Sequence, residues 1–181
     1  MPGKTAILGL NIDVFLDKLS SLSSLRDEVI LRILFETGCS MNELCSIRII
    51  DYIQPKEYLQ LNKIQFIDRQ SIISESLAID IKKYISLRKR SGEDYIFSQN
   101  IKKPLSVKRV EQLVTQIYNG KLKPMQIRYM HIAYAASKGL SPDTICEQTG
   151  LSRQRILQIL DATNITYKQS YSIFGEYGGK K

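Results

Sequence analysis

The chain has 181 residues, and 43% of them are hydrophobic, which suits one folded domain with an apolar core and excludes wholesale disorder. Its 26 Lys and Arg residues outnumber its 18 Asp and Glu residues, which gives a net charge of +8. Such an excess favours polyanionic partners, because phosphates neutralised by cationic side chains release their counterions. The net charge alone does not distinguish such a protein from one that is basic but binds no polyanion.

The possible metal ligands are few. The three cysteines Cys39, Cys45 and Cys146 and the single histidine His131 have none of the spacings of a zinc site. We therefore expect no metal and no cofactor, with His131 in the core and the cysteines as small side chains in a reducing compartment. Without a secretory signal or an apolar run of about 18 residues, we expect no membrane partner and a cytoplasmic, nucleoid-associated location.

Apolar residues recur with helical spacing in the first part of the chain. This pattern predicts helices over residues 11–20, over residues 25–37, and over a short stretch from Met41. Ser24 is expected to cap the second helix and Gly38 to end it. A polar turn is expected to follow over residues 51–56.

The period then changes to the alternation that is typical of β-strands. Strands are predicted over residues 58–66, 69–73 and 95–97, with Asp68 as the turn residue between the first two. A helix that begins after Ser74 is expected before the third strand, and a basic loop over residues 102–104 is expected after it.

The last part of the chain is predicted to be helical, with serine caps at Ser106, Ser141 and Ser152. The expected helices cover residues 107–118, 125–137, 142–149 and 153–162. The fold class expected is mainly α with a small antiparallel β-sheet (α+β). We expect one domain over residues 1–162 and a flexible or partner-docking tail over residues 163–181.

Two segments carry a more specific pattern. In ILFETGCSMNELCSIRIIDY a helix ends in Thr-Gly and a short helix with Asn-Glu-Leu follows. In MQIRYMHIAYAASKGLSPDTICEQTGLS a helix begins with Met-x-x-Arg-Tyr and leads into a turn with glycine. In this order, with the strand pair between them, the segments resemble the two conserved boxes of tyrosine recombinases and phage-type integrases. The resemblance covers about residues 20–162, does not include that family's N-terminal DNA-clamping domain, and implies double-stranded DNA as the partner.

The resemblance also implies where the catalytic groups of that family fall. They are two arginines, two histidines, a strand lysine, a histidine or tryptophan in a turn, and a tyrosine nucleophile. Ser40 and Arg128 stand at the positions of the arginines, and Met125 and Tyr129 at those of the histidines. The strand lysine falls near Lys63, the turn residue at Leu151, and the nucleophile at Leu160. Serine cannot replace a bidentate guanidinium, and neither methionine nor leucine supplies a proton or a nucleophile. The resemblance therefore implies a degenerate active site.

Residues 141–160 also resemble a helix-turn-helix. Cys146 holds the small position of the first helix, Gly150 the turn, and Ile156 the apolar anchor of the second helix. The second helix would then project side chains that suit a major groove, namely Arg153, Gln154 and Arg155. A packed helix corner with a solvated basic face is the alternative.

These observations leave three hypotheses. The first is a DNA-binding protein with the recombinase fold that does not cleave DNA and acts as an accessory, regulatory or architectural factor, as a homo-oligomer or with a partner recombinase. Its expected DNA contacts are Arg128, Lys63, Lys102, Lys103, Lys108, Arg109, Arg153, Gln154 and Arg155. The second is an active but divergent recombinase whose nucleophile is Tyr167 or Tyr171 in the tail. The third is a helix-turn-helix transcriptional regulator.

Overall fold

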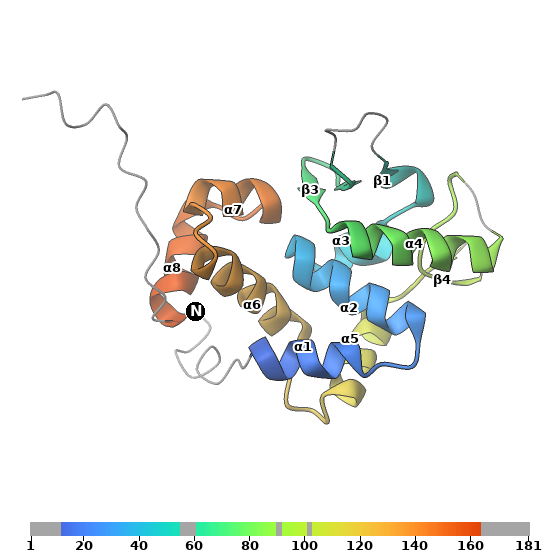
Figure 1. Ribbon diagram of the computed structural model, residues 1–181, viewed down its shortest axis with the longest axis horizontal. Coiled ribbons are helices and arrows are strands. Elements are labelled where there is room, and N and C mark those ends of the chain that lie inside the picture. The colour runs from blue at the N-terminus through green and yellow to red at the C-terminus, as the bar shows by residue number, and fades with distance from the viewer. Residues whose placement is uncertain (1–11, 55–60, 90–91, 101–102, 164–181) are drawn as a thin grey trace, which may run out of the picture.

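The computed structural model describes residues 12–54, 61–89, 92–100 and 103–163, most of which are helical (Figure 1). The helices are α1 (Ile12–Ser20), α2 (Leu25–Thr37), α3 (Met41–Ser46), α4 (Glu75–Arg88), α5 (Val107–Ile117), α6 (Pro124–Ser137), α7 (Pro142–Thr149) and α8 (Arg153–Thr163), with a short 3-10 helix at Ile49–Asp51. Within the described ranges, no helix has both the length and the apolar character that a membrane span requires.

Serine side chains set the starts of most of these helices. In each case the hydroxyl oxygen accepts a hydrogen bond from the backbone N–H three residues further on, and the residues are Ser24, Ser40, Ser74, Ser106 and Ser141. Such a cap satisfies one of the N–H groups that a helix start leaves without a partner. Gly38 and Gly150 end α2 and α7 in the left-handed region, with φ of +58° and +70°. The predicted order of helices is confirmed.

The strands are short. β1 (Tyr52–Ile53), β2 (Lys63–Gln65) and β3 (Gln70–Ile72) form an antiparallel sheet in that order, and β4 (Ser98–Asn100) pairs with β5 (Lys103–Pro104). The chain turns between β2 and β3 at residues 67–68, where Phe66 N donates to Arg69 O at 2.8 Å. The expected fold class, mainly α with a small antiparallel sheet, is confirmed.

Several predicted strand positions were wrong. Residues 95–97 are not a continuous strand: Tyr95 forms a single antiparallel bridge with Arg48, and Ile96 N donates to Ile47 O at 2.9 Å. The strand β4 begins only at Ser98. The expected turn over residues 51–56 contains β1, and the expected basic loop contains β5. Of the first predicted strand, residues 58–60 lie outside the described residues and only residues 63–65 are paired.

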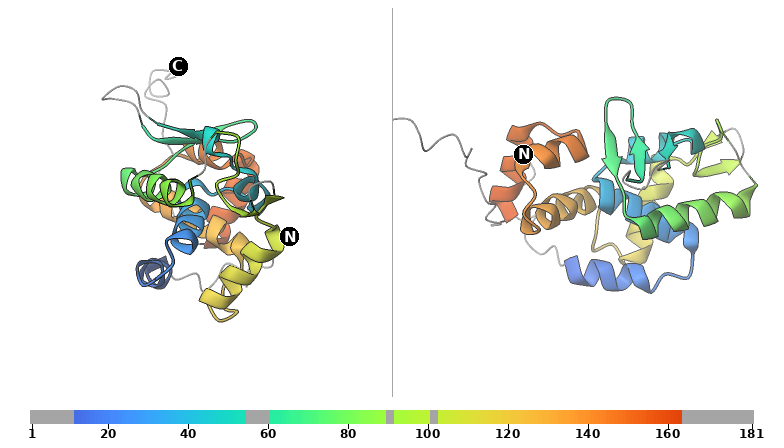
Figure 2. Two further views of the ribbon diagram at one scale, coloured as in Figure 1. Left: turned by 90° about the vertical axis from the view of Figure 1, so that its right-hand side faces the viewer. Right: turned by 45° about the horizontal axis from the view of Figure 1, so that its top comes forward.

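Two hydrophobic cores lie side by side and share α6. The larger one is formed by α1 to α6 with the sheet, and the smaller one by α6, α7 and α8. Figures 1 and 2 show α7 and α8 at one end of the molecule, beside α6. On α6 itself, Ile127 and Met130 belong to the larger core, whereas Tyr129 and Ile132 belong to the smaller one. The helix therefore joins the two parts.

A glutamine side chain makes the contact between α7 and the sheet. Gln148 Nε2 donates to Ile72 O at 2.8 Å, and Ile72 N donates to Gln148 Oε1 at 3.1 Å. The same Nε2 donates to Glu36 O at 3.2 Å, and the hydroxyl of Ser71 donates to Gln148 O at 2.7 Å. The amide of Gln148 thus pairs with the outer edge of β3 as a neighbouring strand would, and it fixes the end of α7 beside α2.

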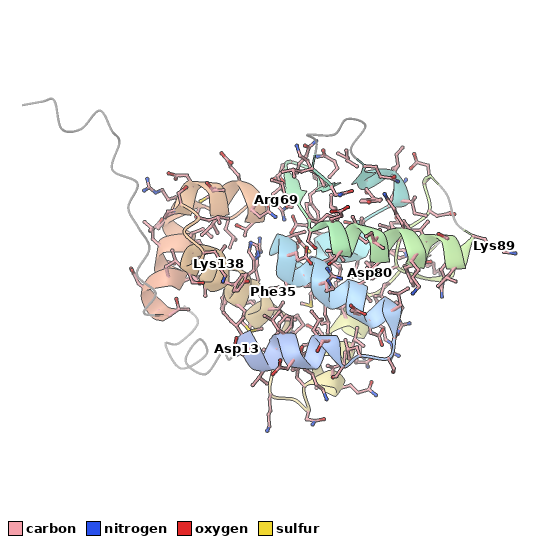
Figure 3. All side chains as sticks on the ribbon, in the orientation of Figure 1. Asp13, Phe35, Arg69, Asp80, Lys89 and Lys138 are labelled. Atoms are coloured by element: carbon pink, nitrogen blue, oxygen red, sulfur yellow. The ribbon has the colours of Figure 1, made fainter. Side chains whose placement is uncertain are left out.

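A buried arginine joins α2 to α4. The side chain of Arg32 is 13% exposed and forms ion pairs with three carboxylates. These are Glu28 at 3.9 Å, Glu36 at 3.1 Å and Asp80 at 2.5 Å, the last of which is labelled on α4 in Figure 3. This guanidinium is therefore more than neutralised by its surroundings.

Candidate functional site

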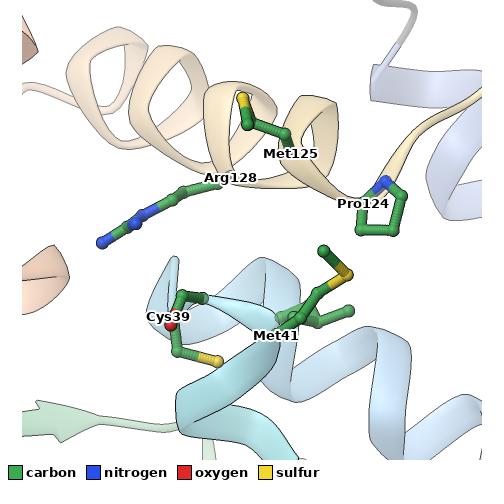
Figure 4. A pocket seen from close by; sticks show the side chains of 7 residues that line it. Cys39, Met41, Pro124, Met125 and Arg128 are labelled. Carbon is green, nitrogen blue, oxygen red and sulfur yellow. The ribbon is translucent and has the colours of Figure 1, made fainter. Parts of the chain in front are cut away.

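A cavity of about 100 Å³ lies between the start of α6 and the bend that joins α2 to α3 (Figure 4). It is lined by Leu34, Cys39, Ser40, Met41, Pro124, Met125 and Arg128. The structure therefore brings together three positions that the sequence singles out, Ser40, Met125 and Arg128. The walls are mostly apolar, and Arg128 is the cation that lines them.

Ser40 has a structural role at this cavity. Its hydroxyl accepts a hydrogen bond from Glu43 N at 3.2 Å, while its own N–H donates to Glu43 Oε2 at 2.7 Å. This reciprocal pair is a capping box, and it uses the side chain of Ser40 to start α3. The residue therefore carries no charge to the cavity.

Arg128 is held from α7. Its Nη2 donates to Thr149 O at 2.6 Å, and this carbonyl lies at the C-terminal end of α7, where the helix dipole is negative. Its Nε is buried without a hydrogen-bond partner. Burial lowers the pKa of Arg128, an effect that the charge of Glu43 opposes and the charge of Arg69 reinforces. The guanidinium is thus fixed in place with one donor group unused.

Tyr129 connects the cavity to α8. Its hydroxyl donates to Sδ of Met125 at 3.2 Å and accepts from Nη2 of Arg155 at 3.0 Å. Tyr129 is buried in the smaller core, while Met125 is 59% exposed at the cavity. The guanidinium of Arg155 is consequently turned inward, whereas the sequence predicted that it projects from α8.

Arg69 is a second cation near the cavity that the sequence did not single out. Its side chain is only 7% exposed, and its Nη2 donates to Glu43 Oε1 at 2.7 Å. Its guanidinium carbon lies 4.1 Å from the ring centre of Phe66, and a Cβ atom at Gly150 would lie 2.6 Å from its Nε. Figure 3 labels Arg69 where the hairpin of β3 faces α7. Spacing along the chain could not reveal this site, because it depends on the packing of the hairpin against α3 and α7.

His131 and Cys39 are uncharged neighbours of the two arginines. Burial, together with the charges of Arg128 and Arg69, lowers the pKa of His131 to about 4, although the carbonyl of Phe35 accepts a hydrogen bond from the ring. Burial likewise raises the pKa of the Cys39 thiol to about 12. The expectation that His131 belongs to the core is confirmed, since it is 7% exposed.

The position of the expected nucleophile lies in the smaller core. Leu160 is fully buried beside Ile156 and Ile159, and Leu151 packs against the same cluster. The alternative nucleophiles Tyr167 and Tyr171 lie outside the described residues. Within the described part of the chain, no group of three or more His, Cys, Asp or Glu side chains is arranged to hold a metal ion.

The remaining predicted contacts are spread over the molecule. Lys63 is half-buried on β2, with Nζ 3.4 Å from Gln70 Oε1, and Lys102 lies outside the described residues. The exposed ones are Lys103 on β5, Lys108 and Arg109 on α5, and Arg153 and Gln154 on α8. Figure 1 shows α8 and β4, the partner of β5, at opposite ends of the molecule, so these residues do not form one cluster around the cavity.

Comparison with known proteins links this arrangement to one group. The chain is 31% identical over 157 residues to the tyrosine recombinase XerA of Pyrococcus horikoshii, which covers 82% of the chain and 54% of that protein. It is 26% identical over 136 residues to a tyrosine recombinase of Pseudothermotoga lettingae, which covers 73% of the chain and 48% of that protein. The chain thus spans about half the length of these relatives. No family model matches it.

Solved structures share the fold. The XerA recombinase structure superposes with a TM-score of 0.72 at 21% identity, over 87% of this chain and 60% of that one. XerH recombinase in a post-cleavage complex with a palindromic difH substrate gives 0.74 at 16% identity, over 86% and 50%. A lambda integrase dimer bound to a core site gives 0.63 at 14% identity, over 91% and 62%. In sequence the chain is thus similar to tyrosine recombinases, and it shares the fold of the tyrosine-recombinase catalytic domain.

Proposed function

We propose that the chain binds double-stranded DNA without cutting it and acts as an accessory, regulatory or architectural factor. The composition of the cavity carries this proposal. Where the family resemblance implies two arginines and a histidine around a phosphate, the cavity has Arg128 beside Ser40 and Met125. Binding to DNA is supported by the net charge of +8 and by the DNA-bound complexes of XerH and lambda integrase, which share the fold.

The loss of cleavage follows from the chemistry of phosphoryl transfer. The charge that develops on the non-bridging oxygens needs fixed donors, and the loss of one such donor typically slows a reaction by about 100- to 1000-fold. Ser40 is committed to a helix cap, and Met125 offers no proton. Leu160 has no hydroxyl and is fully buried. Without a proton donor and a nucleophile at these positions, the cavity supports binding of a phosphate better than its transfer.

Contacts between exposed cationic side chains and the phosphate backbone of the DNA would supply much of the affinity for DNA. Besides Arg128, the described candidates are Lys103, Lys108, Arg109 and Arg153. Lys63 is half-buried and would contribute less. Because these residues are spread over the molecule, we expect a long contact surface and a strong dependence of affinity on salt.

Two assays on the full chain test the proposal. Fluorescence anisotropy with a random-sequence duplex should show affinity that falls steeply as salt rises, and Arg128→Ala should weaken it. Incubation with a nicked suicide substrate should give no covalent protein–DNA adduct. An adduct that disappears in Tyr167→Phe or Tyr171→Phe would establish instead an active recombinase with a tail nucleophile.

A helix-turn-helix regulator is the second candidate, supported by the α7–α8 corner. Gly150 makes the turn, and Arg153 and Gln154 are exposed on the first turn of α8, where Arg153 Nε lies 3.4 Å from Asp143 Oδ1. This function predicts that Arg153→Ala and Gln154→Ala abolish sequence preference while Arg128→Ala has little effect. The opposite result favours the first proposal.

We further infer that residues 1–162 act as one DNA-binding domain and that residues 163–181 dock a partner, either a second copy or a partner recombinase. The dimeric state of lambda integrase on its core site supports this inference. A DNA ligand would place the protein in the cytoplasm, at the nucleoid. Sedimentation of the full chain with a duplex should then show more than one chain for each DNA molecule.

A further inference from the structure

Arg69 is buried to a degree that is rare for an arginine, which requires the guanidinium to be bound on several sides. Glu43, Ser71 and the ring of Phe66 occupy three of those sides. On the remaining side the guanidinium lies against Gly150, where even a Cβ atom would collide with it. Gly150 follows Thr149, whose carbonyl accepts the hydrogen bond of Arg128. Two arginines therefore converge on adjacent residues at the end of α7.

The charges at this point do not balance. Glu43 is the carboxylate that Arg69 contacts, and within the described residues no salt bridge joins Arg128 to any carboxylate. The neighbouring Cys39 and His131 are neutral at pH 7, so two guanidinium groups share one negative charge. Arg32 shows the contrast, because its single guanidinium faces three carboxylates. An arginine with a purely structural role is neutralised by its ion pairs, as Arg32 is. The site of Arg69 and Arg128 instead holds one positive charge in excess.

Hydrogen bonding shows the same deficit. Within the part of the chain that the structure describes, the Nε atoms of Arg69 and Arg128 are both buried and have no hydrogen-bond partner. Buried donors in proteins are nearly always satisfied, and exceptions call for a reason such as a ligand-binding role. Both residues lie beside the bend of α2 and α3 that also forms the wall of the cavity. Arg69 is enclosed, whereas Arg128 lines the cavity, so an anion in the cavity would contact Arg128 and complement the excess charge of the pair.

We propose that Arg69 and Arg128 act as a pair toward one phosphate group of the ligand, with Arg69 supplying from the β2–β3 hairpin the positive charge that Ser40 does not supply. Arg128 reaches the cavity and contacts the phosphate. Arg69 stands behind it as a positioning residue that raises the electrostatic potential of the cavity. This inference rests on the proposed DNA binding. Glu43 then limits the affinity of the cavity for the phosphate, because its carboxylate offsets part of the charge of Arg69.

Measurement of duplex affinity against salt concentration for the full chain and its variants tests the pair. Arg69→Met should weaken binding by about 5- to 20-fold and reduce the slope of log affinity against log salt by about 0.5 to 1, because a fixed charge near a phosphate is lost. Arg69→Lys, which keeps the charge, should retain the slope. Glu43→Gln should tighten binding by about 2- to 5-fold, because the carboxylate that offsets the charge of the two arginines is lost.

Arg32→Met is the matched control, because it removes another ion-paired arginine, with a side chain 13% exposed, from the α2–α4 junction. It should lower thermal stability and leave the salt slope unchanged. If Arg69→Met is folded and keeps the affinity and slope of the wild type while Arg128→Ala weakens binding, the pair is disproved and the proposed function stands. If the wild type shows no salt-dependent affinity for duplex DNA, both are overturned.

Discussion

Gly38 lies directly against the imidazole ring of His131: a Cβ atom at Gly38 would stand 2.7 Å from Cδ2 of His131. The same atom would stand 2.8 Å from Cγ2 of Thr149. Gly38 also needs the left-handed conformation that ends α2. The helices α2, α6 and α7 therefore approach one another at a point where only a hydrogen atom fits.

We expect Gly38→Ala to lower the free energy of unfolding by about 2–5 kcal/mol, from left-handed strain of about 1–2 kcal/mol and an overpacking cost of about 1–3 kcal/mol. Gly92→Ala is the matched control, because Gly92 has φ of +53° and no atom within 4 Å of its added Cβ. That variant should lose only the strain. Urea denaturation of both variants measures the difference, and equal losses would contradict the packing argument.

Gln148→Leu should lower the free energy of unfolding by about 1–3 kcal/mol, because the backbone groups of Ile72 and Glu36 lose hydrogen-bond partners. Hydrogen exchange at the N–H of Ile72 should become faster in this variant. Gln154→Leu removes an exposed amide from α8 and should change neither quantity. An unaltered exchange rate at Ile72 would show that α7 is held on β3 by other contacts.

Leu160→Tyr, which places a tyrosine where the resemblance to recombinases implies the nucleophile, should not create strand cleavage. Leu160 is fully buried, so the larger ring overpacks the smaller core and destabilises the fold by about 1–3 kcal/mol. Leu157→Tyr, at a partly exposed position on the same helix, is the control and should be nearly neutral. Thermal unfolding and adduct trapping test both points, and a stable variant that traps DNA would refute them.

Acidification should destabilise the protein through His131. Its pKa is about 4 in the folded protein against 6.5 when unperturbed, so the unfolded chain binds the proton first as the pH falls. Stability is therefore complete above pH 6.5 and is lost between pH 6.5 and 4, by up to about 3 kcal/mol. His131 is the single histidine of the chain, and His131→Gln should remove the loss between pH 6.5 and 5. The same pH slope in this variant would assign the effect to other groups.

The helices could be predicted because their signals are local. A serine cap or a left-handed glycine acts within one turn of the chain, as at Ser74 and Gly150, so the sequence alone contains the information. The pair β2 and β3 lies within the predicted strands 58–66 and 69–73, but β1 and β5 were predicted as a turn and a loop, because two residues give no alternation to detect.

The cavity was partly predictable. The resemblance to recombinases pointed to Ser40, Met125 and Arg128, which line one cavity. The capping role of Ser40, the inward turn of Arg155 and the burial of Arg69 were not foreseen. Each depends on a partner distant in sequence or on a competition between two uses of one side chain. The spacing of Ser40 and Glu43 is that of a capping box and could have shown the first, whereas the contacts of Arg155 and Arg69 depend on tertiary packing.

The amide of Gln148 also affects whether another protein chain can add a strand to the sheet. An open strand edge is a template onto which another chain can add a strand, and repeated addition leads to aggregation. At Ile72 the edge of β3 is already paired with a side chain, which cannot itself extend into a further strand. One glutamine thus blocks the addition of a further strand at this edge of the sheet.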